Sequence, residues 1–485
     1  MTVDNLQHIE QNFSHMQEQL ANQQRAFLAR PMPTAAERIR RLDKLHNALI
    51  DYRERLVEAV SHDFGGRSRA ETLLAEFYAT LEGIAYNRKH LTKWMKPEKR
   101  HASLTVFPAR VEVMYQPIGV VGIVVPWNFP IFLCLSPLVG ALAAGNRAMI
   151  KTSEFAPHTS VLLKEMLEKI FDTGEVAVVE GGVEVSTAFT QLPFDHLVFT
   201  GATNIGKLVM AAAAPNLTPV TLELGGKSPA VIHPDFPIEE AANRLAFGKS
   251  INAGQICVSP DYILCPRNHV EAFVDSYTRA VSQHYPTMVS NTDYTAIIND
   301  RQRDRLLSYL DDAEQQGATL LPINPKNENF EGTGKLPPTL VLHATENMRV
   351  MKEEIFGPIL PIIPYDTVDG AIDFINEKPR PLALYYFDWD KKRSRTMLER
   401  THSGGVCVND TLSHVTSDDI PFGGVGPSGM GHYHGKEGFL NFSKAKGIVR
   451  KGKVNIAALV APPWDRPIYN ALMKMQAFRF RKRRL

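Results

Sequence analysis

The sequence predicts an α/β protein that combines a doubly wound parallel sheet, a second α/β domain and a small β ribbon. The first observation is the alternation of apolar strands with helices over residues 119–224, which is typical of a doubly wound sheet. The second is a sparser alternation of the same kind over residues 229–387. The third is the length of 485 residues, which exceeds one core because domains usually hold about 100–200 residues.

Helices are expected to open the chain. Apolar residues at steps of three and four predict an amphipathic helix over residues 4–30. Thr34 and Glu37 have the spacing of a capping box, which predicts that a second helix begins there. Helical periodicity continues to about residue 64, where Gly65 is expected to cap it, and resumes over residues 69–94.

A ribbon and then a buried sheet follow the helices. Apolar and polar residues alternate over residues 103–116, which predicts a polar-faced hairpin or long ribbon. The apolar run at 119–126 is typical of a strand that is buried on both faces. The remaining elements are strands at 148–151, 176–179, 196–200 and 220–224 and helices at 133–144, 160–171, 184–191 and 205–214.

The second region repeats the pattern less densely. Beyond it, the glycine-rich segment 421–438 is typical of a crossing loop, and a strand is expected over residues 438–449. The elements expected before that loop are strands at 229–233, 262–265, 340–342, 359–363 and 384–387 and helices at 238–251, 270–284 and 300–316.

Composition restricts the function classes. The net charge is +2, from 54 basic and 52 acidic residues, which gives no support for a nucleic-acid partner. The four cysteines form no CxxC pair and no Cys/His cluster, so we expect no disulfide, no metal site and a reducing cytoplasm. The N-terminus does not resemble a signal peptide, and no run of 18 apolar residues predicts a membrane span.

Cys257 is the candidate nucleophile. It lies in Gly254-Gln-Ile-Cys257, between two apolar segments, and Gly254 permits a tight backbone approach. A soft nucleophile held on a turn suits thiol-based acyl chemistry. The alternative is that Cys257 only packs as a small apolar residue. The other three cysteines are interpreted as packing residues.

Two polar side chains are candidate partners of Cys257. Glu223 ends an apolar strand, where burial would raise its pKa toward that of a general base. The alternative is a structural ion pair with Lys227. Asn128 follows the strand at 119–125, so its amide could donate to an oxyanion at the carboxyl edge of the sheet. The alternative for Asn128 is a turn between two prolines.

Two further strand ends carry candidate cofactor ligands. Lys151 and Glu154 follow the second strand and could bond a ribose diol. Thr200-Gly-Ala-Thr-Asn-Ile-Gly206 follows a later strand and opens a helix whose amides suit a phosphate. This segment is neither a GxGxxG fingerprint nor a P-loop, so each signal is weak by itself.

Together, seven motifs resemble those of the aldehyde dehydrogenases and occur in that family's order over residues 119–447. The details are similar to the class 3 branch and, by overall similarity, to bacterial coniferyl aldehyde dehydrogenases. The motifs are Pro126-Trp-Asn-Phe-Pro130, Lys151-x-Ser-Glu154, Phe199-Thr-Gly201 with Gly206, Leu222-Glu-Leu-Gly-Gly-Lys-Ser-Pro229, Gly254-Gln-x-Cys257, Glu353-Glu-Ile-Phe-Gly-Pro358 and Pro421-Phe-Gly-Gly424.

The resemblance implies a mechanism. Cys257 would attack the aldehyde, the Asn128 amide and the Cys257 N–H would hold the oxyanion, and hydride would pass to the nicotinamide. Glu223 would then activate water to release the acid from the thioester. The implied cofactor residues are Lys151 and Glu154 at the adenosine ribose, Thr200, Gly201, Ala202 and Gly206 at the pyrophosphate, Glu354 at the nicotinamide ribose and Phe356 packed beside it.

The resemblance also implies the cofactor. Glu154 would repel a 2′-phosphate, which favours NAD, while NADP stays open because the class 3 branch often accepts both. Two positions depart from the family pattern. Thr152 stands where proline is more frequent, and Ala202 stands where serine is frequent, so one phosphate hydrogen bond is expected to be missing.

The expected reaction is oxidation of an aromatic aldehyde such as coniferyl aldehyde, giving ferulate. The alternatives are a broad-specificity dehydrogenase of medium- and long-chain aliphatic aldehydes, a CoA-acylating enzyme and a non-catalytic binding protein. A homodimer is expected. The basic cluster that begins at Lys474 is interpreted as a solvated tail, with weak peripheral contact to an anionic membrane as the alternative.

These assignments divide the chain. Residues 1–102 and 119–222 are predicted to form the NAD-binding domain and residues 223–420 the catalytic domain. Residues 103–118 and 421–450 are predicted to bridge the domains and to mediate oligomerisation, and residues 451–485 to form the tail.

Overall fold

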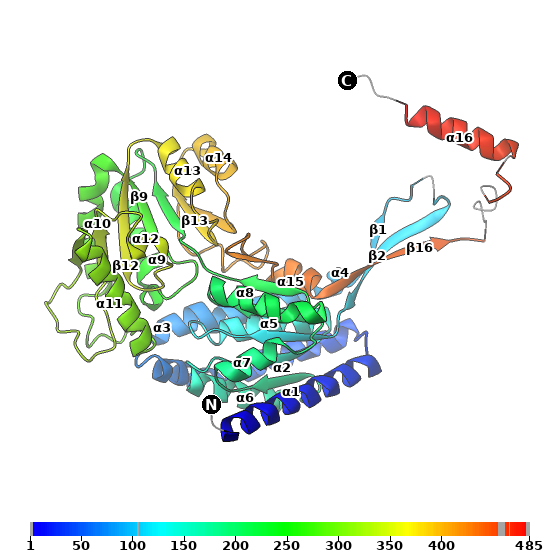
Figure 1. The fold of residues 1–485 in the computed structure, drawn as a ribbon, viewed down its shortest axis with the longest axis horizontal. Coiled ribbons are helices and arrows are strands. Elements are labelled where there is room, and N and C mark those ends of the chain that lie inside the picture. Colours follow the sequence, from blue (N-terminus) through cyan, green and yellow to red (C-terminus); the bar gives the residue numbers. More distant parts are fainter. Residues whose placement is uncertain (1–2, 104–105, 454–460, 465, 482–485) are drawn as a thin grey trace.

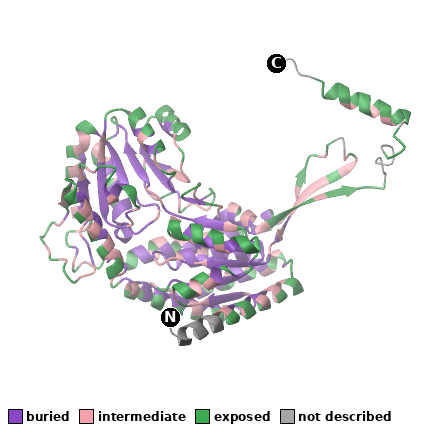
Figure 2. Cartoon of the chain, viewed as in Figure 1, coloured by how far each residue is buried: buried purple, intermediate pink, exposed green. Residues whose placement is uncertain are grey.

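The computed structural model describes residues 3–103, 106–453, 461–464 and 466–481, and for residues 3–12 only the backbone. Helices flank two large sheets, and a three-stranded ribbon projects from them (Figure 1). The predicted α/β class with parallel sheets is confirmed, and the strands of both large sheets are mostly buried (Figure 2). In the described residues, no helix has the length and apolar character that crossing a membrane requires.

The first sheet has the strand order β15-β7-β6-β3-β4-β5. All of its strands except β15 run parallel, and the chain order reverses between β3 and β6. Ligands of open α/β sheets bind at such a switch point, outside the carboxyl ends of the strands. The strands are β3 (Val120–Val124), β4 (Arg147–Lys151), β5 (Val176–Val179), β6 (His196–Thr200), β7 (Val220–Glu223) and β15 (Gly429–Met430).

Both faces of this sheet are covered, which explains its continuous apolar strands. Val120 and Met149 pack with Met16 and Leu20 of α1 on one face, while their neighbours along the strands pack in the main core on the other. The helices of the first face are α1 (Val3–Ala29), α7 (Val183–Thr190) and α8 (Thr203–Ala213), and those of the second are α2 (Ala35–Asp63), α5 (Phe132–Ala144) and α6 (Pro157–Ile170).

The N-terminal helices match the prediction and add one irregularity. Thr34 and Glu37 form both hydrogen bonds of the capping box at the start of α2, and Gly65 follows the helix with a φ of 65°. The predicted helix over 69–94 consists of α3 (Arg69–Thr72), a π-helical segment (Leu73–Tyr78) and α4 (Ala79–Trp94). Such π segments are frequent at functional sites.

The second sheet has the order β10-β11-β12-β9-β8-β13-β14, and only its edge strand β10 is antiparallel. The sequence did not predict β10, β14, α12, α13 or α14. For α14 the reason is physical, since only Ser394 and Met397 of this charged helix are buried, so it lacks apolar periodicity. The strands are β8 (Pro229–Ile232), β9 (Tyr262–Pro266), β10 (Thr319–Pro322), β11 (Thr339–Leu342), β12 (Ile359–Tyr365), β13 (Ala383–Phe387) and β14 (Gly405–Val408). The helices beside it are α9 (Ile238–Ser250), α10 (Val270–His284), α11 (Asp300–Gln315), α12 (Arg349–Lys352), α13 (Val368–Asn376) and α14 (Lys391–Arg400).

The third sheet is the ribbon, formed by β1 (Glu98–Arg100), β2 (Ala109–Pro117) and β16 (Ser443–Lys451). The predicted strand over 438–449 is wrong at its start, because residues Gly435–Asn441 form helix α15. Gly438 and Phe439 are buried there, and a Cβ on Gly438 would lie 2.1 Å from the Tyr433 carbonyl oxygen. The predicted crossing loop is likewise interrupted by β15 and by the start of α15.

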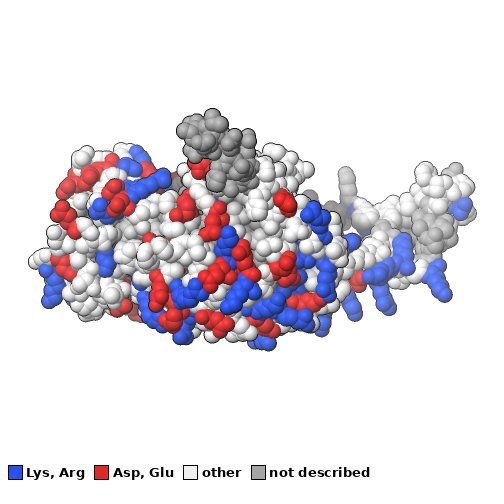
Figure 3. Space-filling model, turned by 90° about the horizontal axis from the view of Figure 1, so that it is seen from below, with Lys and Arg blue, Asp and Glu red and all other residues white. Residues whose placement is uncertain are grey.

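The tail contains an element that the sequence did not predict. Residues Pro467–Arg479 form helix α16, which buries none of its residues in this chain and lies beyond the ribbon (Figure 1). The basic residues 482–484 that follow it lie outside the described residues. Acidic and basic side chains are interspersed over the body on the face shown in Figure 3, whereas the ribbon carries mainly basic ones, among them the exposed Lys444, Lys446 and Lys451. The domain limits given above stay predictions.

Candidate active site

A strained turn presents Cys257. Helix α9 ends at Ser250, and Asn252 and Ala253 then take left-handed backbone conformations with φ of 51° and 49°. Gly254 has a φ of 72°, and a Cβ there would lie 2.4 Å from the Gly357 carbonyl oxygen. Only glycine fits such a close approach. The turn therefore packs the segment before Cys257 directly against the backbone after Phe356.

Asn128 is tied to the same turn. Its Nδ2 donates to the Gln255 carbonyl oxygen at 3.1 Å, and its own carbonyl oxygen accepts from Asn252 Nδ2 at 3.2 Å. Gln255 is held in turn, since its Nε2 donates to the Asn252 and Ala296 carbonyl oxygens. This hydrogen bond from Nδ2 orients the Asn128 amide, which has two N–H donors; its role toward an oxyanion stays a prediction.

The Cys257 thiol is half-buried and lies within electrostatic range of two carboxylates. Burial raises the pKa of Cys257 to about 12, and the Glu354 and Glu223 carboxylates raise it further, while the backbone N–H groups of Cys257 and Val258 act in the opposite direction. At neutral pH the thiol is therefore protonated in this state of the protein. Its reaction requires a base or an added positive charge near the sulfur.

Glu223 is a buried carboxylate without a partner. Neither of its oxygens has a hydrogen-bond partner among the described residues, and burial raises its pKa well above 4.5. The alternative of an ion pair with Lys227 is wrong. Lys227 Nζ instead contacts Asp261 and donates to the Val350 carbonyl oxygen at 2.7 Å. A raised pKa and an unpaired carboxylate suit a general base.

Glu354 and Phe356 lie close to this centre. A Cβ on Gly225 would lie 2.1 Å from Glu354 Oε2, so the glycine after Leu224 makes room for this carboxylate. Burial and the charge of Asp261 raise the pKa of Glu354 to about 8, and its Oε1 has no partner among the described residues. Phe356 has a φ of 51°, and its ring meets that of Trp127 edge to face at 5.3 Å.

The other predicted cofactor residues lie at the carboxyl ends of β4 and β6. Lys151 is buried, which lowers its pKa, and it lies near the carboxylates of Glu154 and Glu180. Glu154 itself is exposed. The negative charge of these carboxylates would repel a 2′-phosphate, in keeping with NAD rather than NADP.

The segment after Thr200 connects the predicted phosphate-binding residues to Glu223. The Gly201 N–H donates to the Glu223 carbonyl oxygen at 3.0 Å. Ala202 is the N-cap of α8 and offers no side-chain hydrogen bond to it, so no side chain caps the first amides of this helix. A Cβ on Gly206 would lie 2.7 Å from the Leu224 side chain. The small residues thus let α8 pack closely on β7, and together with the unpartnered Glu354 oxygen they fit a bound dinucleotide.

Sequence reasoning missed several buried groups around these residues. Lys249 is the clearest, because its Nζ is buried without a partner among the described residues and burial lowers its pKa to about 8. The only sequence signal for Lys249 was that its neighbours at the end of the helix are small or apolar residues. In the described residues, no group of three His, Cys, Asp or Glu side chains is arranged to hold a metal ion. The other missed groups are Arg67, Glu76, Asp261, Tyr433 and His434.

Comparisons with known proteins identify the family of this chain. Residues 8–448 match the model of the aldehyde dehydrogenase family. A Pseudomonas aeruginosa protein named "Probable coniferyl aldehyde dehydrogenase" is 54% identical over 470 residues, covering 97% of this chain and 98% of its own. A "Coniferyl aldehyde dehydrogenase" of Pseudomonas sp. strain HR199 is 47% identical over 90% of this chain and 91% of its own.

Solved structures of aldehyde dehydrogenases are also similar to this chain. The substrate-bound AldH of Staphylococcus aureus has a TM-score of 0.89 at 35% identity and covers 95% of this chain and 99% of its own. A Mycobacterium tuberculosis aldehyde dehydrogenase complexed with NAD+ has a TM-score of 0.81 at 28% identity, with 90% of each chain covered. These matches cover 90–97% of the chain, and the range of the family model contains the positions of all the predicted site residues. The protein belongs to the aldehyde dehydrogenase family.

Proposed function

We propose that Cys257 and Glu223 of this aldehyde dehydrogenase act as nucleophile and general base in oxidising an aldehyde to its carboxylic acid. The observation that carries the proposal is the Glu223 carboxylate, which is buried with neither oxygen partnered and which acts electrostatically on the Cys257 thiol. A purely structural carboxylate would be paired, because an unpaired buried charge costs free energy.

The chain's own groups account for each step. The Cys257 thiol gives its proton to solvent, and the thiolate adds to the carbonyl carbon to form a thiohemiacetal. The free N–H of Asn128 and the backbone N–H of Cys257 stabilise its oxyanion. Oxidation to the thioester needs a hydride acceptor, which NAD supplies when it is bound. Glu223 then takes a proton from water, which attacks the thioester and releases the acid and the thiol.

NAD is the cofactor that these residues fit best. Lys151 and Glu154 are proposed to hold its adenosine ribose, and Thr200, Gly201, Ala202 and Gly206 to surround its phosphates. Glu354 is proposed to bond the nicotinamide ribose, with the Phe356 ring beside it. The NAD+ complex of the Mycobacterium tuberculosis relative supports the choice, and NADP is the alternative.

We propose an aromatic substrate, coniferyl aldehyde, because the relatives at 54% and 47% identity carry that name. Aliphatic aldehydes are the alternative. Hydrolysis is favoured over transfer to CoA because a CoA-acylating enzyme does not need the general base that Glu223 provides.

The test is NADH formation from coniferyl aldehyde, benzaldehyde, a medium-chain alkanal and acetaldehyde. Wild type is expected to oxidise coniferyl aldehyde best, and Cys257→Ala to lose turnover. Cys265→Ala is the matched control, since this thiol is buried within β9 and has no role in the reaction. Activity that survives in Cys257→Ala would refute the nucleophile, and turnover of alkanals alone would refute the aromatic substrate.

The assembly and location are proposed from the ribbon, the tail and the free cysteines. Strand β16 is an edge of the three-stranded sheet in the described structure, and an exposed edge is suited to pairing with a second copy. We therefore propose a homodimer, which light scattering would test. We also propose a cytoplasmic enzyme whose basic tail gives at most weak contact with anionic membranes. Loss of vesicle binding on deletion of residues 455–485 would support that contact, and unchanged binding would exclude it.

A further inference from the structure

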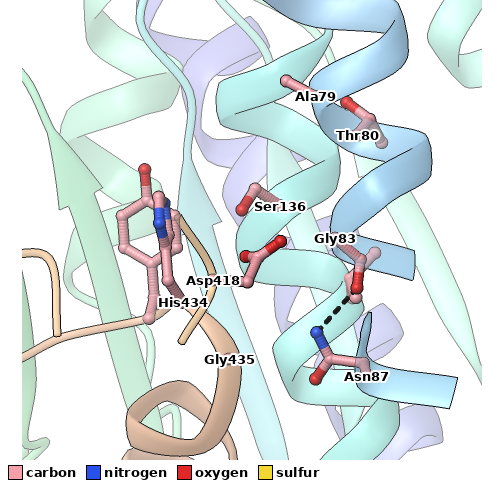
Figure 4. Close-up of a pocket in the computed structure, with 10 residues that line it drawn as sticks. Ala79, Thr80, Gly83, Asn87, Ser136, Asp418, His434 and Gly435 are labelled. Carbon is pink, nitrogen blue, oxygen red and sulfur yellow. Dashed lines mark hydrogen bonds between the residues drawn. The ribbon is translucent and has the colours of Figure 1, made fainter. Parts of the chain in front are cut away.

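Two aspartate carboxylates outside the proposed reacting groups differ in what surrounds them. Asp418 lines a small pocket between helices α4 and α5 and the segment that leads into α15, together with Asn87 and His434 (Figure 4). This pocket has space for about one water molecule, so it encloses no larger ligand. Asp261, in contrast, is 3% exposed, and each of its carboxylate oxygens contacts a different part of the chain.

The Asp261 carboxylate joins two distant segments. Its Oδ1 accepts a hydrogen bond from the Ile355 N–H at 2.9 Å, and its Oδ2 contacts Lys227 Nζ. Lys227 Nζ also donates to the carbonyl oxygens of Val350 and Glu353 at 2.7 and 3.1 Å. The side chains of Asp261 and Lys227 are only 4% and 11% exposed. One buried ion pair therefore holds the main chain on both sides of Glu353.

The segment from Glu354 to Phe356 needs such support. Phe356 has a φ of 51°, a left-handed conformation that is costly for a residue with a side chain and that persists only where the surroundings fix it. Ile355, directly before it, is held at both of its peptide groups. Its N–H donates to Asp261, and its carbonyl oxygen accepts from Arg305 Nη2 at 2.9 Å.

Asp261 also belongs to the segment that carries the nucleophile. It follows Cys257 by four residues, and its own N–H donates to the Ser228 carbonyl oxygen at 2.8 Å. Before Cys257, Gly254 approaches the Gly357 carbonyl oxygen so closely that a Cβ would lie 2.4 Å from it. The chain on either side of Cys257 is thus in contact with the chain on either side of Phe356.

We infer that Asp261 is a positioning residue that holds Glu354 and Phe356 in place for the nicotinamide end of NAD, at a fixed position relative to Cys257. The inference rests on the proposed function, which supplies the cofactor roles of Glu354 and Phe356. Stability alone does not account for the ion pair with Lys227, because apolar residues of similar volume often stabilise a core as well as a buried pair does. Hydride transfer, however, requires the reacting groups to be held in the correct geometry.

The experiment compares Asp261→Asn with Asp261→Leu, two side chains close in size to aspartate. Both remove the charge that pairs with Lys227, but only asparagine keeps an oxygen that accepts the Ile355 N–H. Isothermal titration calorimetry with NAD is expected to show binding roughly tenfold weaker in Asp261→Leu than in Asp261→Asn. The reason is that a segment released from a hydrogen bond spends less time in the conformation that binds.

Hydrolysis of p-nitrophenyl acetate without NAD is the second readout. The ester acylates the Cys257 thiol with loss of nitrophenolate, and water then releases acetate, so no hydride is transferred. In Asp261→Leu this rate is expected to fall much less than the affinity for NAD. The reason is that the two hydrogen bonds donated by Gln255 Nε2 hold the Cys257 turn independently of Asp261.

Asp388→Asn is the matched control. Asp388 is 2% exposed and accepts from Arg393 Nε at 2.7 Å, so it is also a buried carboxylate in an ion pair. It follows the carboxyl end of β13, which pairs in parallel with β8, whereas Lys227 precedes the amino end of β8. Asp388 therefore lies at the opposite end of the second sheet, and its replacement should leave the affinity for NAD unchanged.

Glu354→Gln separates this inference from the proposed cofactor role. If Glu354→Gln weakens NAD binding but Asp261→Leu and Asp261→Asn bind NAD alike, the inference is overturned and the cofactor role stands. If Glu354→Gln also binds NAD as wild type does, both are overturned. Equal losses of NAD affinity and ester hydrolysis in Asp261→Leu overturn the inference too, because they indicate a general structural defect. If Asp261→Leu fails to fold, Asp261→Ala replaces it in the comparison.

Discussion

Arg67 and Glu76 form an ion pair whose two side chains are both 0% exposed, with Nη1 of Arg67 2.9 Å from Oε1 of Glu76. Both side chains form hydrogen bonds with the loop that carries Asn128. Arg67 donates to the Asn128 carbonyl oxygen at 3.0 Å, and Glu76 Oε2 accepts from the Ile131 N–H at 2.7 Å. Glu76 reaches this loop from the π-helical segment between α3 and α4. The irregular helix thus positions the proposed oxyanion donor.

Glu76→Gln is expected to lower both stability and turnover. The change leaves the Arg67 charge unpaired in the core, which costs about 3–5 kcal/mol of unfolding free energy. It also frees the loop of Asn128, so kcat should fall while NAD binding is retained. Urea unfolding and steady-state kinetics measure the two effects. The control is Glu165→Gln, which breaks the exposed Arg55–Glu165 pair and should change neither. Unchanged kcat in a folded Glu76→Gln protein would contradict the positioning role.

Glu223→Gln is expected to stop the reaction at the thioester. Removal of a general base usually costs about 10²–10⁴-fold in rate. NADH should therefore appear in a burst equal to the enzyme concentration and then slowly, with an acyl adduct on Cys257 visible by mass spectrometry. Because burial raises the Glu223 pKa well above 4.5, wild-type kcat should rise with pH as the carboxylate loses its proton, and this rise should vanish in the variant.

Hydroxylamine provides the control for Glu223→Gln. It attacks thioesters without a general base, so it should restore turnover of the variant. Failure to restore it, together with the absence of a burst, would mean that Glu223 acts before the thioester forms.

Glu354→Gln is expected to become more stable relative to wild type as the pH rises from about 4.5 to about 8. The pKa of Glu354 is about 8 in the folded chain against 4.5 for an ordinary glutamate, so the folded state holds the proton more tightly. The free energy of unfolding that protonated Glu354 contributes in wild type is complete below pH 4.5 and is lost as the pH rises from about 4.5 to about 8. Unfolding free energies at pH 5, 6.5 and 8 for both proteins measure the change.

Glu353→Gln gives a control of opposite sign. Hydrogen bonds from Tyr309 and Arg349 lower the pKa of Glu353, so its stabilisation is present above pH 4.5 and is lost as the pH falls. A difference between Glu354→Gln and wild type that does not grow between pH 5 and pH 8 would contradict the buried environment of Glu354.

Lys249→Met is expected to stabilise the protein. The variant replaces a buried amine that lacks a partner with an apolar chain of similar shape, which should add roughly 1–3 kcal/mol near pH 7. Since the Lys249 pKa is about 8 in the folded chain and 10.5 when unperturbed, the gain should be greatest below pH 8 and fade toward pH 10.5. Thermal and urea unfolding over this pH range measure it.

Lys335→Met is the matched control for Lys249→Met. Lys335 is also buried, but its Nζ donates to the carbonyl oxygens of Met288, Val289 and Asn291 at 2.9, 3.2 and 2.7 Å. Its replacement should destabilise the protein because three carbonyl groups lose their partner. Equal effects of the two substitutions would show that Lys249 has partners comparable to those of Lys335.

Local sequence patterns predicted most of the helices and strands because the residues that specify each of them lie within a short stretch of sequence. The start of α2 follows from Thr34 and Glu37, and the parallel strands follow from apolar runs such as 119–126. The pattern failed where tertiary contacts dominate. Gly438 and Phe439 lie in a glycine-rich, weakly periodic segment, yet they belong to a helix in which Gly438 packs against the Tyr433 backbone and the Phe439 ring packs against Tyr115 of the ribbon. Helix α14 escaped prediction because its surface is almost entirely charged.

The sequence by itself determined which groups are proposed to react, because Cys257, Glu223 and Asn128 lie in motifs whose order and residue types resemble those of the family. Only the tertiary structure decided their surroundings. It paired Lys227 with Asp261 and left Glu223 unpartnered, joined Arg67 to Glu76 behind Asn128, and set Asp418 beside His434. The physical reason is that pairing and desolvation depend on which distant segments meet, and these contacts join residues far apart in the chain.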